Sequence, residues 1–351
     1  MGIMPHRDIT RALDLVLGLD IPFWPQLPNV SLYEDMYVQS SQNFPGVTVD
    51  MENARLRFNT ERFHQELNGY FDKMEDPATF TLGKEYSVVY HRFLDHDLSR
   101  YTAIRGQVTG PVSFGMKVLD EESKPIIYNE EVRGILFDFM QRKINTQRTE
   151  MMQKNPNAFV WVDEPGLSSV FSALVGYNDQ QAKSDYLSFV QGLEGTKAMH
   201  LCANVDLPYL LDLGIEILSF DAYQIEFMPD EYAESVARFL NNQGIISWGI
   251  VPTDSTSIKR HTPQTLADML SSYWQTVSKN TSLDPRQIAA QALLAPARCC
   301  LRDIAEADTT SGAAQRTCGM SSQLSVEEEI VEMAYAYLKE MSQILKNKYQ
   351  L

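Results

Sequence analysis

The sequence lacks the long apolar runs of a membrane protein. A stretch of about 18 or more consecutive apolar residues, the usual sign of a membrane-spanning helix, occurs nowhere in the chain. The first residues, MGIMPHRDITRAL, carry charge early and contain no apolar core of the kind found in signal peptides. Neither end carries a lipidation or retention signal. We therefore expect a cytoplasmic protein with no membrane partner.

Cysteine is also scarce, with four residues in a chain of 351. Thiols stay reduced in the cytoplasm, so disulfides are not expected there. We therefore predict that the cysteines are either metal ligands or inert thiols. They are Cys202, Cys299, Cys300 and Cys318.

Positive charge is in short supply. The chain has 30 Lys and Arg residues against 46 Asp and Glu residues, which gives a formal net charge of −16 without a basic cluster. Such a surface repels phosphate backbones, so a nucleic-acid partner is not expected. The glycine-rich motifs G-x-G-x-x-G and G-x-x-x-x-G-K-[ST] follow no expected strand, which argues against the usual nucleotide-binding folds.

What the chain does contain is a repeated alternation of apolar runs and amphipathic stretches. Apolar runs near residues 105, 160, 199, 218, 248 and 294 predict the buried strands of a parallel sheet. Amphipathic helices are predicted over residues 129–154, 179–192, 229–242, 263–277 and 325–345. The last of these is expected to begin at a capping box at Ser325. Gly244 is predicted to take a left-handed conformation after the helix over 229–242.

Polar residues stand at the carboxyl ends of the predicted strands. They are Gln107, Asp163, Glu164, His200, Cys202, Asp221 and Cys299. In a (βα)8 barrel these strand ends converge on one mouth, whereas in an open doubly wound sheet they form a row. We therefore predict an α/β fold in which residues 1–351 form a single (βα)8 TIM barrel. The irregular segment 21–80 is expected to cover the C-terminal mouth of the barrel, and 303–323 to be an inserted loop.

The most informative motif is His200-Leu201-Cys202, at the end of one predicted strand. Both side chains leave the strand on the same face, and an imidazole beside a thiolate is a typical start of a zinc site. A zinc ion held partly by thiolates binds an incoming thiol as a thiolate and makes it nucleophilic at neutral pH. The alternative is a buried histidine beside a buried cysteine.

The remaining ligands of such a site are marked less clearly. Asp221 could supply an oxygen ligand, with Glu226 as its rival. Asp221 could equally cap a helix or form a hydrogen bond with His200. Cys299 ends an apolar run, where a ligand from a barrel strand belongs, whereas Cys318 lies in the predicted loop. We therefore predict Cys299 as a ligand and keep Cys318 as its rival.

Two adjacent carboxylates, Asp163 and Glu164, end another predicted strand and are followed by Pro165. The end of a buried strand is a costly place for a carboxylate without a partner. One carboxylate is therefore predicted to bind a substrate ammonium and the other to orient a neighbour. The alternative is that both cap the next helix. Gln107, in the turn-forming run GQVTGP, is a weaker candidate for contact with the substrate.

These motifs together resemble the catalytic barrel of the cobalamin-independent methionine synthase family. That barrel belongs to a broader group with uroporphyrinogen decarboxylase and the zinc-dependent thiol methyltransferases. The resemblance runs from Gly2 nearly to the C-terminus. It is carried by TGPVS (109–113), VDEP (162–165), HLC (200–202), ILSFD (217–221) and CCL (299–301). It implies a zinc site made of the ligands predicted above, and it implies that Asp163 holds the amino group of homocysteine.

Three positions depart from the family pattern. The late Cys-Gly motif of the family reads Cys299-Cys300 here, while Cys318-Gly319 imitates it downstream. The acidic zinc ligand of the family is usually Glu, and the matching residue here is Asp221. Ile3 stands where the opening motif of the family has Ser, which puts a hydroxyl contact with the substrate in question.

The resemblance implies a zinc-dependent methyltransferase that methylates the thiol of homocysteine to form methionine. Long members of the family carry an additional N-terminal barrel that helps bind a folate donor, and 351 residues leave no room for it. The expected donor is therefore a methylated corrinoid, either methylcobalamin or a corrinoid protein. The alternatives are a zinc methyltransferase for another small thiol such as coenzyme M, a uroporphyrinogen-decarboxylase-like enzyme, and a non-catalytic corrinoid-binding protein. Coenzyme M has no ammonium for Asp163, and the decarboxylase needs an arginine-rich mouth.

Overall fold

The fold was analysed in a computed structural model, which describes residues 2–167, 177, 179–202, 206–225, 228–298 and 320–351. The chain divides into two compact units. The N-terminal unit consists of Val16–Leu201 together with Gly2, and the C-terminal unit consists of Ile3–Leu15 together with Cys202–Leu351. None of the helices in the described ranges combines the length and the apolar character needed to cross a membrane.

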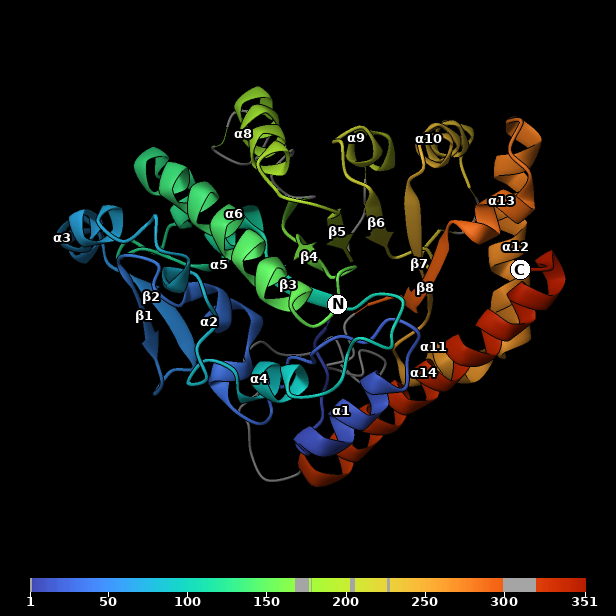
Figure 1. Ribbon diagram of the computed structural model, residues 1–351, viewed down its shortest axis with the longest axis horizontal. Helices are drawn as coiled ribbons and strands as arrows, with labels where there is room; N and C mark the ends of the chain where they lie inside the picture. The colour runs from blue at the N-terminus through green and yellow to red at the C-terminus, as the bar shows by residue number, and fades with distance from the viewer. Residues whose placement is uncertain (1, 168–176, 178, 203–205, 226–227, 299–319) are drawn as a thin grey trace. The chain divides into compact units, whose positions relative to one another are not determined.

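The N-terminal unit is built on three parallel strands, β3 (Arg105–Thr109), β4 (Phe159–Asp163) and β5 (Lys197–Leu201). Helix α6 (Glu130–Met152) lies along β3 and β4 (Figure 1). The two pack so closely at Gly106 of β3 that a Cβ atom there would overlap Gln147 and Met151 of α6. One face of these strands is therefore covered by α6, and alternate residues point to the other face.

The described part of the N-terminal unit contains ten further elements besides these strands and α6. They are η1 (Leu32–Glu34), α2 (Met36–Ser41), β1 (Val47–Asp50), β2 (Arg55–Phe58), α3 (Thr60–Phe71), η2 (Pro77–Thr79), α4 (Val88–Leu94), α5 (Pro111–Lys117), η3 (Ile126–Tyr128) and α8 (Asp179–Gln191). Strands β1 and β2 form an antiparallel hairpin.

The segment 21–80, predicted to cover the mouth, packs in two places. Helix α2 lies at the carboxyl end of β3, where the backbone N–H of Thr109 donates to Ser40 Oγ (3.3 Å) and Thr109 Oγ1 donates to the carbonyl of Met36 (3.2 Å). Farther along the segment, the rings of Phe44 and Phe80 pack against Phe139 of α6, with centroid separations of 5.2 and 5.4 Å. One part of the segment therefore reaches a strand end, and another part packs on α6.

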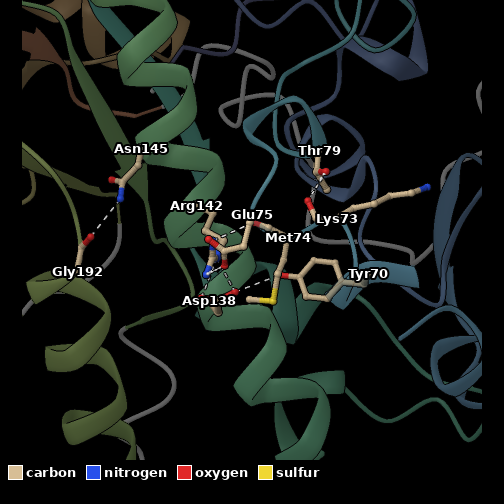
Figure 2. Close-up of polar contacts among 9 residues, drawn as sticks. All are labelled: Tyr70, Lys73, Met74, Glu75, Thr79, Asp138, Arg142, Asn145 and Gly192. Carbon is tan, nitrogen blue, oxygen red and sulfur yellow. Dashed lines mark hydrogen bonds and ion pairs between the residues drawn. The ribbon is translucent and has the colours of Figure 1, made fainter. Parts of the chain in front are cut away.

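A polar cluster, which we call the α3–α6 junction, ties the end of α3 and the turn after it to α6 (Figure 2). Asp138 accepts hydrogen bonds from Tyr70 Oη (3.1 Å) and from Arg142 Nε (3.0 Å). Arg142 also donates to the carbonyl of Met74 (2.9 Å) and forms an ion pair with Glu75 (3.3 Å). Because α6 in turn packs on β3, the junction connects residues 70–75 to the framework of the sheet.

The C-terminal unit contains three further parallel strands, β6 (Ile217–Phe220), β7 (Ile245–Val251) and β8 (Ala292–Pro296). Its helices are α1 (Ile9–Leu17, whose last residues belong to the N-terminal unit), α9 (Leu207–Leu211), α10 (Asp230–Asn241), α11 (Ser255–Arg260), α12 (Pro263–Asn280), α13 (Pro285–Ala290) and α14 (Met320–Tyr349).

The aromatic core of the C-terminal unit runs from β6 through β7 to α12. Phe220, Trp248 and Trp274 pack edge to face, with centroid separations of 5.5 and 6.2 Å. Helix α1 lies beside α14 (Figure 1), where Arg11 forms an ion pair with Glu332. The start of the chain is therefore part of the same unit as its last helix.

The parallel α/β organisation predicted from the sequence is confirmed. Every predicted apolar run forms a strand at the expected place, from β3 to β8. Within the described residues the strands do not show a closed barrel of eight, so barrel closure stays a prediction. The prediction that residues 1–351 form a single domain also stays a prediction.

Two local predictions are wrong. Helix α14 begins at Met320 rather than at the Ser325 capping box, because apolar residues at 320 and 324 extend the helical spacing upstream. After α10, Gln243 takes the left-handed conformation (φ 68°) rather than Gly244. A glycine at 244 leaves room for the ring of Phe239, which a Cβ atom at this position would overlap.

Candidate functional site

Three polar residues lie side by side at the carboxyl ends of β3, β4 and β5. The strand register pairs Thr109 with Asp163, and Asp163 with His200. Paired residues in a parallel sheet point to the same face, which here is the face opposite α6. All three side chains are buried. The sequence-predicted residues Asp163 and His200 are thus neighbours in one buried row.

Asp163 is the least compensated group in this row. Its side chain is fully buried (0% exposed), and neither carboxylate oxygen accepts a hydrogen bond from any residue that the structure describes. Burial raises the pKa of the Asp163 carboxyl above its usual value, and the positive charge of Arg105 opposes that rise. A buried carboxylate of this kind costs free energy unless a cationic group compensates it.

Glu164 has a different role, because its carboxylate caps helix α5. It accepts hydrogen bonds from the backbone N–H groups of Val112 (3.1 Å) and Ser113 (2.8 Å) and from Ser113 Oγ (2.6 Å). Burial raises the pKa of Glu164 to about 7, against the effect of these donors. A Cβ atom at position 110 would overlap the Glu164 carboxylate, so the glycine there leaves room for it. The Glu164 carboxylate is therefore bound by protein groups at the start of α5.

Gln107 is engaged with protein groups on both sides of its amide. Its Nε2 donates to the carbonyl of Trp24 (2.7 Å), and its Oε1 accepts from Arg105 Nη1 (3.2 Å). Gly2 approaches the same amide so closely that a Cβ would overlap it. Gln107 therefore fixes the segment around Trp24 and orients Arg105.

The motif His200-Leu201-Cys202 straddles the division between the two units, which falls after Leu201. His200 is 2% exposed, and burial lowers the pKa of its imidazole well below the usual value, so the ring is neutral. Its carbonyl accepts the backbone N–H of Glu164 (2.9 Å), which connects the two motifs through the backbone. Cys202 is half-buried. A neutral imidazole and a thiol are the donor types that zinc takes.

The predicted late ligands cannot be placed beside this pair. Cys299, Cys300, Cys318 and Glu226 lie outside the described residues. Among the residues that are described, no three His, Cys, Asp or Glu side chains are grouped closely enough to hold a metal ion. The zinc site therefore stays a prediction, supported by the donor types of its first two members.

Asp221 lies in the C-terminal unit, directly after β6. Its carboxylate accepts a hydrogen bond from Arg298 Nε (2.7 Å) and is only 1% exposed, while the Arg298 side chain is 42% exposed. Gln224 donates to the same carboxylate through its backbone N–H (3.2 Å) and its side chain. Asp221 is thus bound by protein groups, and its charged partner is Arg298, which the sequence did not predict.

His6, near the start of the chain, also lies in the C-terminal unit. It is fully buried, and neither ring nitrogen has a hydrogen-bond partner in the part of the chain that the structure covers. Burial lowers the pKa of His6, although Glu328 and Glu332 on α14 raise it in part. His6 is therefore a neutral imidazole that feels the charges of Glu328 and Glu332 on α14.

Arg105 is the residue of this face that sequence reasoning missed. It begins β3 and is 8% exposed, and its guanidinium carbon lies 4.2 Å from the centroid of the Phe23 ring. Its signal in the sequence is a charged residue inside the apolar run TAIRGQV, where a cation is costly unless it is compensated.

Neither a family model nor a curated protein matches this chain. The chain is similar to the solved structure of a B12-independent methionine synthase from Shewanella sp. W3-18-1 in complex with selenomethionine, with 13% identity, a TM-score of 0.46 and coverage of 71% of this chain. It spans 63% of the length of that protein. It is also similar to a methyltransferase from Methanosarcina mazei, with 13% identity, a TM-score of 0.48 and coverage of 96% of this chain and 86% of the other.

Proposed function

We propose that this protein is a zinc-dependent methyltransferase that methylates the thiol of homocysteine to form methionine on a (βα)8 barrel. The observation that carries the proposal is the carboxylate of Asp163. It is fully buried and accepts no hydrogen bond from the described residues. Leaving a buried carboxylate uncompensated costs free energy, and the ammonium of an amino-acid substrate would offset that cost.

The residues around Asp163 support a role in binding rather than in packing. Glu164 fixes the start of α5, and the backbone N–H of Gly110 donates to the carbonyl of Asp163 (2.9 Å), so the backbone that carries the carboxylate is held. Thr109 and His200 flank it on the adjacent strands. Because this row is buried, an ion pair formed there would be stronger than one in water.

His200 and Cys202 would hold the zinc ion, because a neutral imidazole and a thiolate are suitable donors. Cys299 is the proposed third ligand, with Cys318 as its rival. Asp221, which meets Arg298 in the structure, is the proposed fourth, with Glu226 as its rival. Zinc bound there would lower the pKa of the substrate thiol and keep its sulfur as a thiolate at neutral pH.

The proposed methyl donor is a methylated corrinoid, either methylcobalamin or a corrinoid protein. This part of the proposal rests on the resemblance of the sequence motifs to the methionine synthase barrel. It is tested by offering methylcobalamin and methyl-folate in parallel with homocysteine and measuring methionine. Methionine formed only with the folate would remove the corrinoid from the proposal and leave the acceptor unchanged.

The substitution Asp163→Asn tests the acceptor. It keeps the shape of the side chain and removes the charge that would pair with the ammonium. Breaking one side of such a pair typically costs about 2–5 kcal/mol. The catalytic efficiency with homocysteine should therefore fall by roughly one and a half to three and a half orders of magnitude.

Two further measurements separate substrate binding from structure. Because the substitution removes an uncompensated buried charge, the variant should be at least as stable as the wild type in thermal unfolding, and its zinc content should not change. Asp72→Asn, at an exposed position of the same unit, is the matched control. A thiol without an amino group that serves as a good wild-type substrate would favour a coenzyme-M-like acceptor instead. Loss of zinc or of folding in Asp163→Asn would show that the carboxylate is structural.

A further inference from the structure

Arg105 and Asp163 place a cation and an anion on one face of the N-terminal sheet. Arg105, Gln107 and Thr109 alternate along β3, so their side chains share a face, and the register pairs Thr109 with Asp163. The Arg105 guanidinium is oriented by its hydrogen bond to Gln107 Oε1 (3.2 Å) and by the ring of Phe23 below it (4.2 Å). It is therefore held in a defined position rather than extended into solvent.

The spacing of the two charges suits a small zwitterion. Gln107, which receives the guanidinium, pairs with Trp161, two residues before Asp163 on β4. Two residues of a strand span about 7 Å. The carboxylate of Asp163 accepts no hydrogen bond from the described residues, Arg105 included, so the two charges do not meet directly. An α-amino acid placed between them would meet each charge with its opposite.

We propose that Arg105 binds the carboxylate of the same amino-acid thiol whose ammonium binds Asp163; this inference rests on the function proposed above. A planar guanidinium offers two parallel N–H donors to a carboxylate, which fixes the orientation of the ligand as well as its affinity. The acceptor substrate is then defined as a thiol that carries both groups on one carbon. A simple amine thiol or a simple acid thiol would satisfy only one end.

The test is calorimetric binding of three ligands to the full-length protein. They are L-homocysteine, 3-aminopropane-1-thiol, which lacks the carboxylate, and 4-sulfanylbutanoate, which lacks the ammonium. A lost buried charge pair of at least 2 kcal/mol is about 30-fold in affinity, so the wild type should prefer homocysteine to each analogue by about that factor or more.

The variants should remove these preferences one at a time. Arg105→Met should weaken the binding of homocysteine by about 30-fold or more and leave the binding of the carboxylate-free analogue nearly unchanged. Asp163→Asn should likewise weaken the binding of homocysteine, and it should leave the binding of the ammonium-free analogue nearly unchanged. Arg105→Gln removes the charge while keeping an amide for Gln107, and it replaces Arg105→Met if the latter fails to fold. Arg100→Met, at an exposed site of the same unit, is the matched control and should bind all three ligands as the wild type does.

The outcomes distinguish this inference from the proposed function. If homocysteine binds the wild type and Asp163→Asn weakens it, but the Arg105 variants bind it as tightly as the wild type, the role of Arg105 is overturned and the function stands. If the wild type does not distinguish homocysteine from 4-sulfanylbutanoate, the ammonium site fails, and both proposals fail with it.

Discussion

Lys143 should lower the stability of this protein at neutral pH. It lies in the middle of α6, is 4% exposed, and its ammonium has no hydrogen-bond partner among the described residues. Its Nζ lies 5.6 Å from the centroid of the Phe139 ring. Burial lowers the pKa of Lys143 from 10.5 to about 7, and Glu150 offsets only part of that effect. Methionine has a similar length and no charge, so Lys143→Met should be more stable than the wild type.

The magnitude and the sign follow from proton linkage. In the unfolded chain the amine binds its proton up to its ordinary pKa, whereas in the folded protein it releases the proton near pH 7. Between these two pKa values the unfolded state binds more protons, so the free energy of unfolding rises with pH. At pH 7 the penalty is about 4 kcal/mol, since one pKa unit is worth about 1.4 kcal/mol. The penalty shrinks above pH 7 and vanishes above about pH 10.5.

Urea unfolding from pH 6 to pH 10 measures this effect. The difference between Lys143→Met and the wild type should reach several kcal/mol near neutral pH and decline as the pH rises. Lys154→Met, at an exposed position just after the same helix, should change stability little at any pH. A difference that does not depend on pH, or a variant that is less stable at pH 7, would refute this account of Lys143.

Three other outcomes are expected. Because the pKa of Glu164 is raised to about 7, the folded state keeps its proton to higher pH than the unfolded state does, so the stability of the wild type should fall as the pH rises from 4.5 to 7. Chemical unfolding across this range should show that Glu164→Gln removes this dependence, which is worth at most about 3 kcal/mol. Arg142→Met should remove contacts of the α3–α6 junction and lower the free energy of unfolding by about 1–3 kcal/mol, as measured by thermal unfolding. Arg62→Met, at an exposed position of α3, should change the free energy of unfolding little. Metal analysis should find about one zinc per chain in the wild type and in Cys318→Ser. It should find little zinc in His200→Ala, Cys202→Ser and Cys299→Ser. The reverse result for Cys299 and Cys318 would make Cys318 the ligand.

The strands were predictable because each is an apolar run that ends in a change of composition. AFVWVDEP shows both features, and β4 occupies that run. The helix boundaries were less predictable, since local signals compete. Ser325 begins a capping pattern, yet apolar spacing upstream carries α14 through it. Gly244 allows a left-handed turn, yet the residue that takes the left-handed conformation is Gln243.

The candidate site was predictable in its residue types and not in its connections. Asp163 and Glu164 differ in their hydrogen bonding because Glu164 is bound by Ser113, which lies 51 residues away in the chain. The position of Arg105 was not predictable either, because it depends on which face of β3 is covered by α6. A hydrogen bond of that range is not encoded in a local pattern. Because β3 is buried on both faces, its composition does not show which face the helix covers.

The place of α1 has a consequence for synthesis on the ribosome. Residues 3–15 belong to the C-terminal unit, where Arg11 on α1 meets Glu332 on the last helix. The N-terminal unit has nearly all of its residues once Leu201 has been made, and domains generally fold as units as the chain emerges. Residues 3–15 must instead wait for the final helix, across more than 300 residues of intervening chain. A nascent chain arrested before α14 should therefore protect β3–β5 from protease while its first helix is still cut.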